Sequence, residues 1–153
     1  MNKQALEPMW AYLHKILGNA RRQVELIPED KFGFKPTPDV RSIGELCIHL
    51  FTYVTESTET VLKGKHEQKE EYKFTNKADL LKWMDGRVEQ GYANFAKITD
   101  AQLAATINAW GMDFPAWQMV SFVFDEVLHH RGQLTVYLRL IGITPVFIYD
   151  YVD

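Results

Sequence analysis

The sequence is poor in cysteine, in clusters of like charge and in long apolar runs, and each shortage excludes a class of protein. Cys47 is the only cysteine, so no disulfide can form within the chain and a reducing compartment, the cytoplasm, is expected. The opening residues, MNKQALEPMW, lack the apolar centre of a signal peptide. No apolar run approaches the length that crosses a bilayer. We therefore expect a cytoplasmic protein without a membrane partner.

The charge pattern and the absence of several motifs exclude further classes of function. Seventeen basic and 20 acidic residues give a net charge of -3, and the basic residues form no stripe, so no nucleic-acid partner is expected. The sequence contains no glycine-rich phosphate loop, no G-x-S-x-G nucleophile elbow and no C-x-x-C pair.

Helical periodicity is what the sequence does contain. The chain of 153 residues is long enough for one hydrophobic core, and apolar side chains recur at helical spacing in four segments, with no convincing alternating strand. We predict helices over about residues 3–27, over 42–63, from near Asn76 and over about 113–142. Residues 104–110 fit a loop or a short turn. The pattern predicts an all-α four-helix bundle forming a single domain, 1–153.

The second predicted helix has the clearest ends. Ser42 and Glu45 form an S-x-x-E capping box, in which each side chain accepts a hydrogen bond from a free backbone N–H of the first turn. Gly64 is placed to end the same helix. The simplest role for Glu45 is therefore that of a cap.

The last predicted helix carries polar side chains where a core helix would carry leucines. At about 100° per residue, Glu126, His130, Gln133 and Tyr137 fall on one inward arc. A carboxylate in a bundle core is costly unless it is paired. Two alternatives satisfy Glu126: a hydrogen bond to His130 or to an arginine, or a metal ion shared by this i, i+4 pair.

Two strings in the sequence carry a resemblance to a known family. SIGELCIHL opens the second predicted helix and HHRGQ lies in the last. Together with the long first helix and the Pro-containing linker, they resemble the DinB/YfiT-like superfamily, whose members are four-helix bundles that usually bind a metal. The resemblance covers nearly the whole chain.

The resemblance implies a metal site, with one departure. The usual ligands of the superfamily are a histidine in the second helix and an H-x-x-x-H pair in the last, the second of which precedes R-G-Q. By position, His49 and His130 match two of these ligands, and Glu126 occupies the third place. A site of two histidines and one carboxylate keeps three protein donors and leaves positions open. The implied cofactor is one divalent ion, Zn²⁺ first, with Ni²⁺, Fe²⁺ or Mn²⁺ as alternatives.

Periodicity alone does not place His49 at such a site. On its helix it shares a polar face with Tyr53 and Glu56, so either this face is open surface or it lines a pocket. Only the resemblance favours the pocket.

The function that the resemblance implies is that of a metal-dependent enzyme, either a hydrolase or a thiol S-transferase, acting on a small molecule. Gln133 and Tyr137 could orient water or substrate, and a homodimer is expected from the habit of the superfamily. The alternative is a non-catalytic bundle, stress-related or metal-sequestering, that has lost the activity of its relatives. Glu126 in place of histidine is the feature that leaves this alternative open.

Other residues with chemical potential have simpler roles. Cys47 is expected to pack as a small hydrophobe. His129 lies nearer the wet side of its helix than His130 does, and His14 and His66 are expected to face solvent. Arg131 is expected to form a structural salt bridge.

Overall fold

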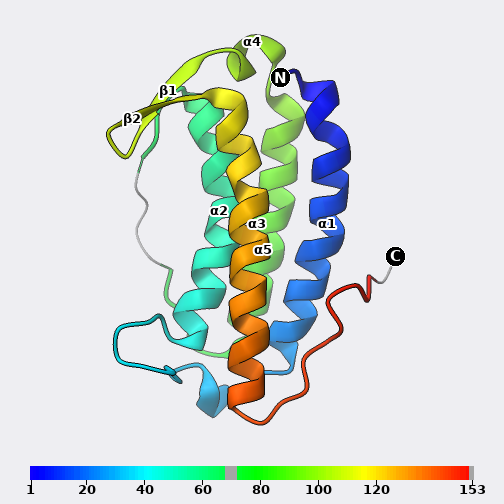
Figure 1. The fold of residues 1–153 in the computed structure, drawn as a ribbon, viewed down its shortest axis with the longest axis vertical. Coiled ribbons are helices and arrows are strands. Elements are labelled where there is room, and N and C mark those ends of the chain that lie inside the picture. Colours follow the sequence, from blue (N-terminus) through cyan, green and yellow to red (C-terminus); the bar gives the residue numbers. More distant parts are fainter. Residues whose placement is uncertain (68–71, 152–153) are drawn as a thin grey trace.

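The computed structural model describes residues 1–67 and 72–151, and four long helices of this part lie side by side (Figure 1). They are α1 (Lys3–Glu25), α2 (Ile43–Lys63), α3 (Lys77–Lys97) and α5 (Ala116–Leu140). Helices α1 and α2 each contact both α3 and α5, so every long helix packs against two others. The structure is mostly helical, which confirms the all-α prediction at that level.

The ends of α2 are those that the sequence predicts. The Ser42 hydroxyl accepts a hydrogen bond from the Glu45 backbone N–H (3.2 Å), and the Glu45 carboxylate accepts one from the Ser42 backbone N–H (2.6 Å). Gly64 ends the helix in the left-handed conformation, with φ 68°. Because both ends are fixed, the position of His49 along the helix axis is fixed as well.

We expect Ser42→Ala to lower the free energy of unfolding by about 1 kcal/mol, the usual cost of losing an N-cap. Urea denaturation followed by circular dichroism measures this change. Ser121→Ala is the matched control, because the Ser121 hydroxyl bonds back to the Trp117 carbonyl in the interior of α5, where alanine is the better helix former. Equal destabilisation by both substitutions would contradict the capping role.

A small hairpin replaces the predicted loop and the predicted start of the last helix. Strands β1 (Thr106–Ala109) and β2 (Met112–Pro115) pair antiparallel, so the expectation of a loop over 104–110 and of a helix from near residue 113 is wrong. The two turn residues, Trp110 and Gly111, have φ values of 52° and 77°, as a tight two-residue hairpin turn requires. Four residues per strand are too few for a clear alternating pattern.

Two short elements complete the chain. A 3₁₀ turn, η1 (Glu29–Lys31), follows α1, which ends two residues earlier than predicted, and a one-turn helix, α4 (Asp100–Leu103), precedes the hairpin. Helix α5 begins after Pro115, which stands at its N-cap. A proline lacks the backbone N–H that a helix interior needs, so it suits this boundary.

Cys47 lies in the core, on the same helix as His49. It is fully buried on α2, and burial raises the pKa of its thiol to about 12. A thiol this protonated is a poor nucleophile and a poor ligand. Cys47 therefore packs as a small hydrophobe, as predicted.

Within the described residues, no helix combines the length and the apolar character needed to cross a bilayer.

Candidate metal centre

Three side chains converge between α2 and α5. His49 comes from α2, and Glu126 and His130 come from successive turns of α5. The Glu126 Oε2 atom lies 3.0 Å from His130 Nε2 and 3.5 Å from His49 Nε2. One ligand atom from each residue lies within 4.8 Å of the other two, and this His/Glu/His group could hold a metal ion. We call it the triad.

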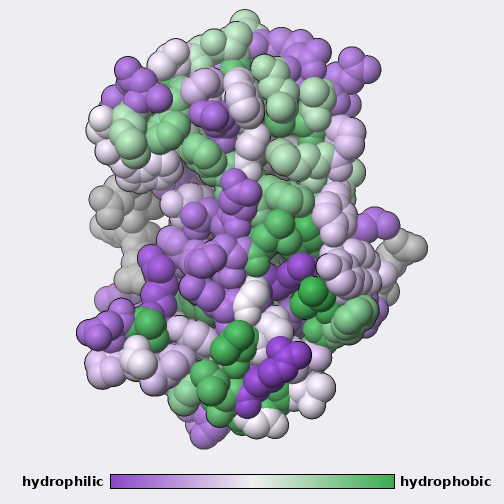
Figure 2. Space-filling model, viewed as in Figure 1, coloured by the Kyte–Doolittle hydropathy of each residue, from purple (hydrophilic) through white to green (hydrophobic). Residues whose placement is uncertain are grey.

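The triad sits at the boundary between core and surface. His130 is 4% exposed, whereas the side chains of His49 and Glu126 are 26% and 31% exposed. Glu126 therefore lies less deep than the inward arc of α5 suggests. The His49 ring meets the His130 ring edge-on, with centroids 4.6 Å apart, so His49 faces α5 rather than bulk solvent. Figure 2 shows hydrophilic residues gathered midway along the face formed by these two helices.

The surroundings of His49 keep its imidazole neutral. Burial is the main cause that lowers its pKa to about 4, and the charge of Arg41 and the neighbouring His130 ring act in the same direction. A neutral ring carries the lone pair that a metal ion needs. The local electrostatics thus prepare His49 for coordination near neutral pH.

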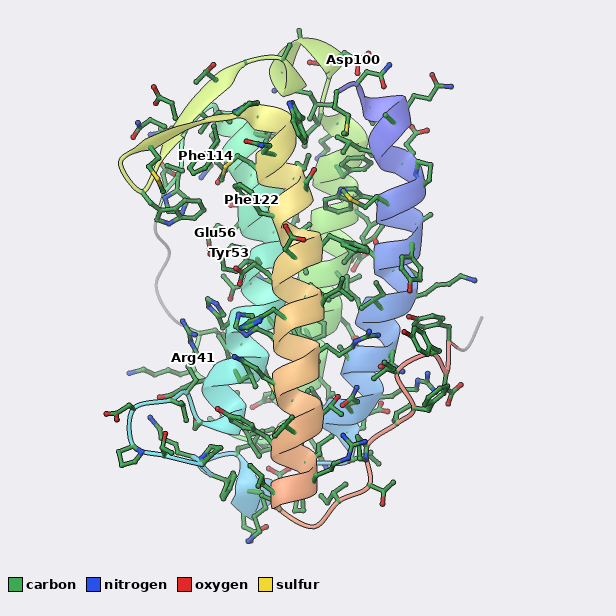
Figure 3. All side chains as sticks on the ribbon, viewed as in Figure 1. Arg41, Tyr53, Glu56, Asp100, Phe114 and Phe122 are labelled. Carbon is green, nitrogen blue, oxygen red and sulfur yellow. The ribbon has the colours of Figure 1, made fainter. Side chains whose placement is uncertain are left out.

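Tyr53 lies one turn along α2 from His49 and packs against it. Their ring centroids are 5.2 Å apart in an edge-on arrangement. Burial, followed by the negative charges of Glu126 and Glu56, raises the pKa of Tyr53 to about 12. The phenol therefore stays protonated and can donate a hydrogen bond near the triad. Figure 3 shows Tyr53 and Glu56 on the flank of α2.

A chain of hydrogen bonds fixes the tautomer of His130. The Gln133 side-chain NH₂ donates to His129 Nε2 (3.0 Å), which turns the Gln133 carbonyl oxygen toward His130. His130 Nδ1–H then donates to that oxygen (2.8 Å). In a neutral ring, Nε2 is left with a lone pair, and this lone pair faces the Glu126 carboxylate 3.0 Å away. Two acceptors at this distance repel each other unless a proton or a cation lies between them.

The distances within the triad suit a cation. Ligands at about 2.0–2.1 Å from a tetrahedral ion are separated from one another by about 3.3–3.4 Å. The two nitrogen–oxygen separations, 3.0 and 3.5 Å, bracket this value, and the ligand nitrogens of the two histidines lie within 4.8 Å of each other. The Gln133 carbonyl on the far nitrogen of His130 is also the kind of partner that orients metal-bound histidines. The residues present therefore fit a divalent ion.

Comparisons with known proteins identify the family of the chain. A profile of the DinB family matches residues 1–153. The chain belongs to the DinB family. The uncharacterized protein YjoA of Bacillus subtilis (strain 168) is 24% identical over 129 residues, and the match covers 82% of this chain and 84% of YjoA.

Two solved structures share the fold of this DinB-family chain. The crystal structure of YjoA, a DinB-like protein, covers 92% of this chain and 96% of its own, with a TM-score of 0.76 and 21% identity. A DinB-like protein from Bacillus cereus ATCC 10987 covers 94% of this chain and 97% of its own, with a TM-score of 0.78 and 15% identity. At these identities the likeness shows the fold alone.

Other histidines of this DinB-family protein lie outside the triad. His129 is exposed and serves as the acceptor for Gln133, and His14 is exposed, as predicted. The expectation for His66 is wrong, because its side chain is only 13% exposed. Its Nε2 atom lies 2.6 Å from Glu56 Oε1, and its ring lies against Trp110 at 4.7 Å. No pattern in the sequence indicates that the chain after α2 folds back onto Glu56.

Arg131 and Tyr137 bind backbone rather than the groups expected of them. Arg131 is buried, and its guanidinium donates to the Ile148 carbonyl (3.1 Å). Within the described residues, this contact with the C-terminal segment takes the place of the predicted salt bridge. The Tyr137 hydroxyl donates to the Arg41 carbonyl (3.3 Å) and so holds the loop before α2. Gln133 is the residue of the predicted pair that reaches the triad.

Arg41 and Tyr53 are the residues near the triad to which the sequence assigned no role. Arg41 lies in an irregular linker, where no periodicity indicates a direction. Tyr53 shares the helix face of His49, so its position would have followed had that face been known to line a site.

Proposed function

We propose that this DinB-family protein is a metal-dependent enzyme that holds one divalent ion with His49, Glu126 and His130. The observation that supports the proposal is the convergence of three donor atoms: Glu126 Oε2 lies 3.0 Å from His130 Nε2 and 3.5 Å from His49 Nε2. A cation between these groups turns a repulsive contact into coordination.

The donor set favours Zn²⁺ among the candidate ions. Two imidazole nitrogens and one carboxylate oxygen are common zinc ligands and leave room for water or substrate. The same set also suits Fe²⁺, Ni²⁺ and Mn²⁺. A bound ion would act as a Lewis acid that polarises a carbonyl group or lowers the pKa of water or of a thiol. Hydrolysis of a small molecule and S-transfer of a thiol are the two reactions we propose for it.

Other residues near the triad would orient its ligands and bind the substrate. Gln133 holds the His130 ring in one tautomer through the 2.8 Å hydrogen bond to Nδ1. Tyr53 keeps its proton because its pKa is about 12, so its hydroxyl can donate to an oxygen of the substrate. Partial exposure of Glu126 and His49 leaves a path by which a substrate can reach the triad.

Further features are part of the same proposal. We propose that residues 1–153 form one domain, a four-helix bundle of the DinB/YfiT type, and that it works in the cytoplasm as a homodimer. The mostly helical structure and the match over residues 1–153 support the first part. Two aromatic residues are exposed near the C-terminus, Phe147 at 68% and Tyr149 at 63%, and they support the homodimer.

Metal analysis of protein purified without chelators or added metal tests the proposal. We expect about one equivalent of a divalent ion per chain. The donor set favours Zn²⁺ as that ion. If the purified chain carries no ion and binds none on titration with Zn²⁺, Fe²⁺, Ni²⁺ or Mn²⁺, the proposal fails. The alternative would then be a non-catalytic bundle in which Glu126 and the histidines bond only to one another.

We expect Gln133→Leu to weaken Zn²⁺ binding by about tenfold, because it removes the acceptor that holds His130 Nδ1–H. Competition with a chromophoric chelator measures the affinity. Gln133→Glu keeps an acceptor at the same place and should restore most of the loss. Gln118→Leu, 15 residues earlier on α5 and so about 22 Å away along the helix axis, is the matched control and should bind as the parent does. Wild-type affinity in Gln133→Leu would refute the orienting role.

A further inference from the structure

A cavity of about 600 Å³ lies next to the triad, and its lining comes from three segments. The loop before α2 contributes Lys35, Asp39 and Arg41, the first turn of α2 contributes Glu45, and α5 contributes Gln133 and Tyr137. This volume falls within the range that small-molecule sites occupy. We call it the Arg41 pocket.

The Arg41 pocket begins one helical turn from the triad. Glu45 precedes His49 by four residues on α2, and Gln133 follows His130 by three residues on α5. At 1.5 Å per residue, the offset along the helices is about 6 Å. Gln133 joins the two directly, because it lines the pocket and also accepts the hydrogen bond from His130. A molecule of a few bonds' length can therefore span from the triad into the pocket.

Most charged and polar groups in the pocket already form ion pairs or hydrogen bonds with other groups of the protein. The Lys35 ammonium pairs with the Glu45 carboxylate at 3.2 Å, and Glu45 also caps α2. The Tyr137 hydroxyl is bonded to the Arg41 carbonyl. Asp39 is exposed at the rim, where solvent screens its charge.

Among the described residues, the Arg41 guanidinium is the positive charge of this pocket without an ion pair, and like Asp39 it is exposed to solvent. Its backbone is held in place by Tyr137 on one side and by the cap at Ser42 on the other. Figure 3 shows Arg41 on the same flank of the molecule as Tyr53 and Glu56, nearer the start of α2.

We infer that the Arg41 pocket binds the carboxylate of a small acidic substrate whose reacting end lies at the triad. The inference rests on the proposed function and names its substrate class. A guanidinium presents a planar pair of N–H donors that matches a carboxylate. An ion held by the triad, together with Arg41 in the neighbouring pocket, would select a molecule that carries its negative charge at the end away from the reaction.

Thiol binding to the Co²⁺-loaded full chain tests the inference. The probes are γ-mercaptobutyrate and its neutral amide, which have the same length and the same thiol and differ in charge at the far end. Thiolate coordination to Co²⁺ produces a charge-transfer absorption band, so each affinity is read directly. We expect the acid to bind about fivefold more tightly than the amide, as a partly exposed ion pair allows.

Variants assign that preference to Arg41. Arg41→Gln should bring the acid-to-amide ratio to about one without changing the affinity for the amide, and Arg41→Lys should keep part of the preference. Arg139→Gln removes an exposed arginine from the outer side of α5, outside the pocket lining, and should leave the ratio unchanged.

The outcomes separate this inference from the function on which it rests. If Co²⁺ binds and the two thiols bind equally, or if Arg41→Gln keeps the preference, the inference is wrong and the metal site stands. If Co²⁺ binds and neither thiol coordinates, the pocket does not open onto the triad and the inference is also wrong. If Co²⁺ itself does not bind, the proposed function and the inference fail together.

Discussion

Replacing His130 with alanine is expected to weaken divalent metal binding by more than about 100-fold, because the loss of a ligand costs more than the loss of a residue that orients one. His130 is the most buried member of the triad, and its ring is fixed by Gln133. Without it, His49 and Glu126 remain as two partly exposed donors. Elemental analysis after dialysis, together with Zn²⁺ competition titration, measures the loss.

The same substitution should remove the stabilisation that metal gives the fold. A ligand at 100 times its Kd stabilises the folded state by about 2.7 kcal/mol, so excess Zn²⁺ should raise the Tm of the parent protein and leave that of His130→Ala almost unchanged. His14→Ala, an exposed histidine on α1, is the control and should respond to Zn²⁺ as the parent does. Parent-like metal affinity in His130→Ala would show that any bound ion sits elsewhere.

The Glu126–His130 half of the triad could be predicted from the sequence because one helix carries it. Residues at i and i+4 on one helix meet whatever the rest of the chain does, and the structure places the two atoms 3.0 Å apart. The approach of His49 depends on how α2 packs against α5, and its helix face is polar throughout. Periodicity cannot tell a polar pocket wall from a polar surface, so the resemblance to relatives was needed there.

The features that the sequence did not reveal depend on contacts distant in sequence or on unusual backbone. The hairpin of β1 and β2 turns at Trp110, a residue with positive φ that turn statistics do not favour. His66 returns to Glu56 across ten residues, and Arg41 reaches its pocket from an irregular loop. The caps of α2, in contrast, involve residues three apart, and the structure has them as the sequence predicts.

The tight contact between Gly91 on α3 and Val54 on α2 predicts the largest loss of stability on substitution. A Cβ atom built on Gly91 would lie 2.6 Å from both Cγ1 and the backbone carbonyl oxygen of Val54. Val54 is fully buried on α2, so neither its side chain nor its backbone can move without displacing the helix. We expect Gly91→Ala to lower the free energy of unfolding by about 3 kcal/mol, the upper part of the range for overpacking, as measured by urea denaturation.

Gly86→Ala on the same helix is the matched control. A Cβ atom there meets nothing within 4 Å, and alanine is the better helix former by about 1 kcal/mol, so this variant should be more stable than the parent. Destabilisation of similar size at both positions would show that the Val54 contact is not the cause of the loss at Gly91. Because α2 also carries His49, folded Gly91→Ala should bind Zn²⁺ more weakly than the parent, whereas Gly86→Ala should bind it equally. The packing of α2 and α3 would then contribute to the geometry of the triad, which lies on the opposite side of α2.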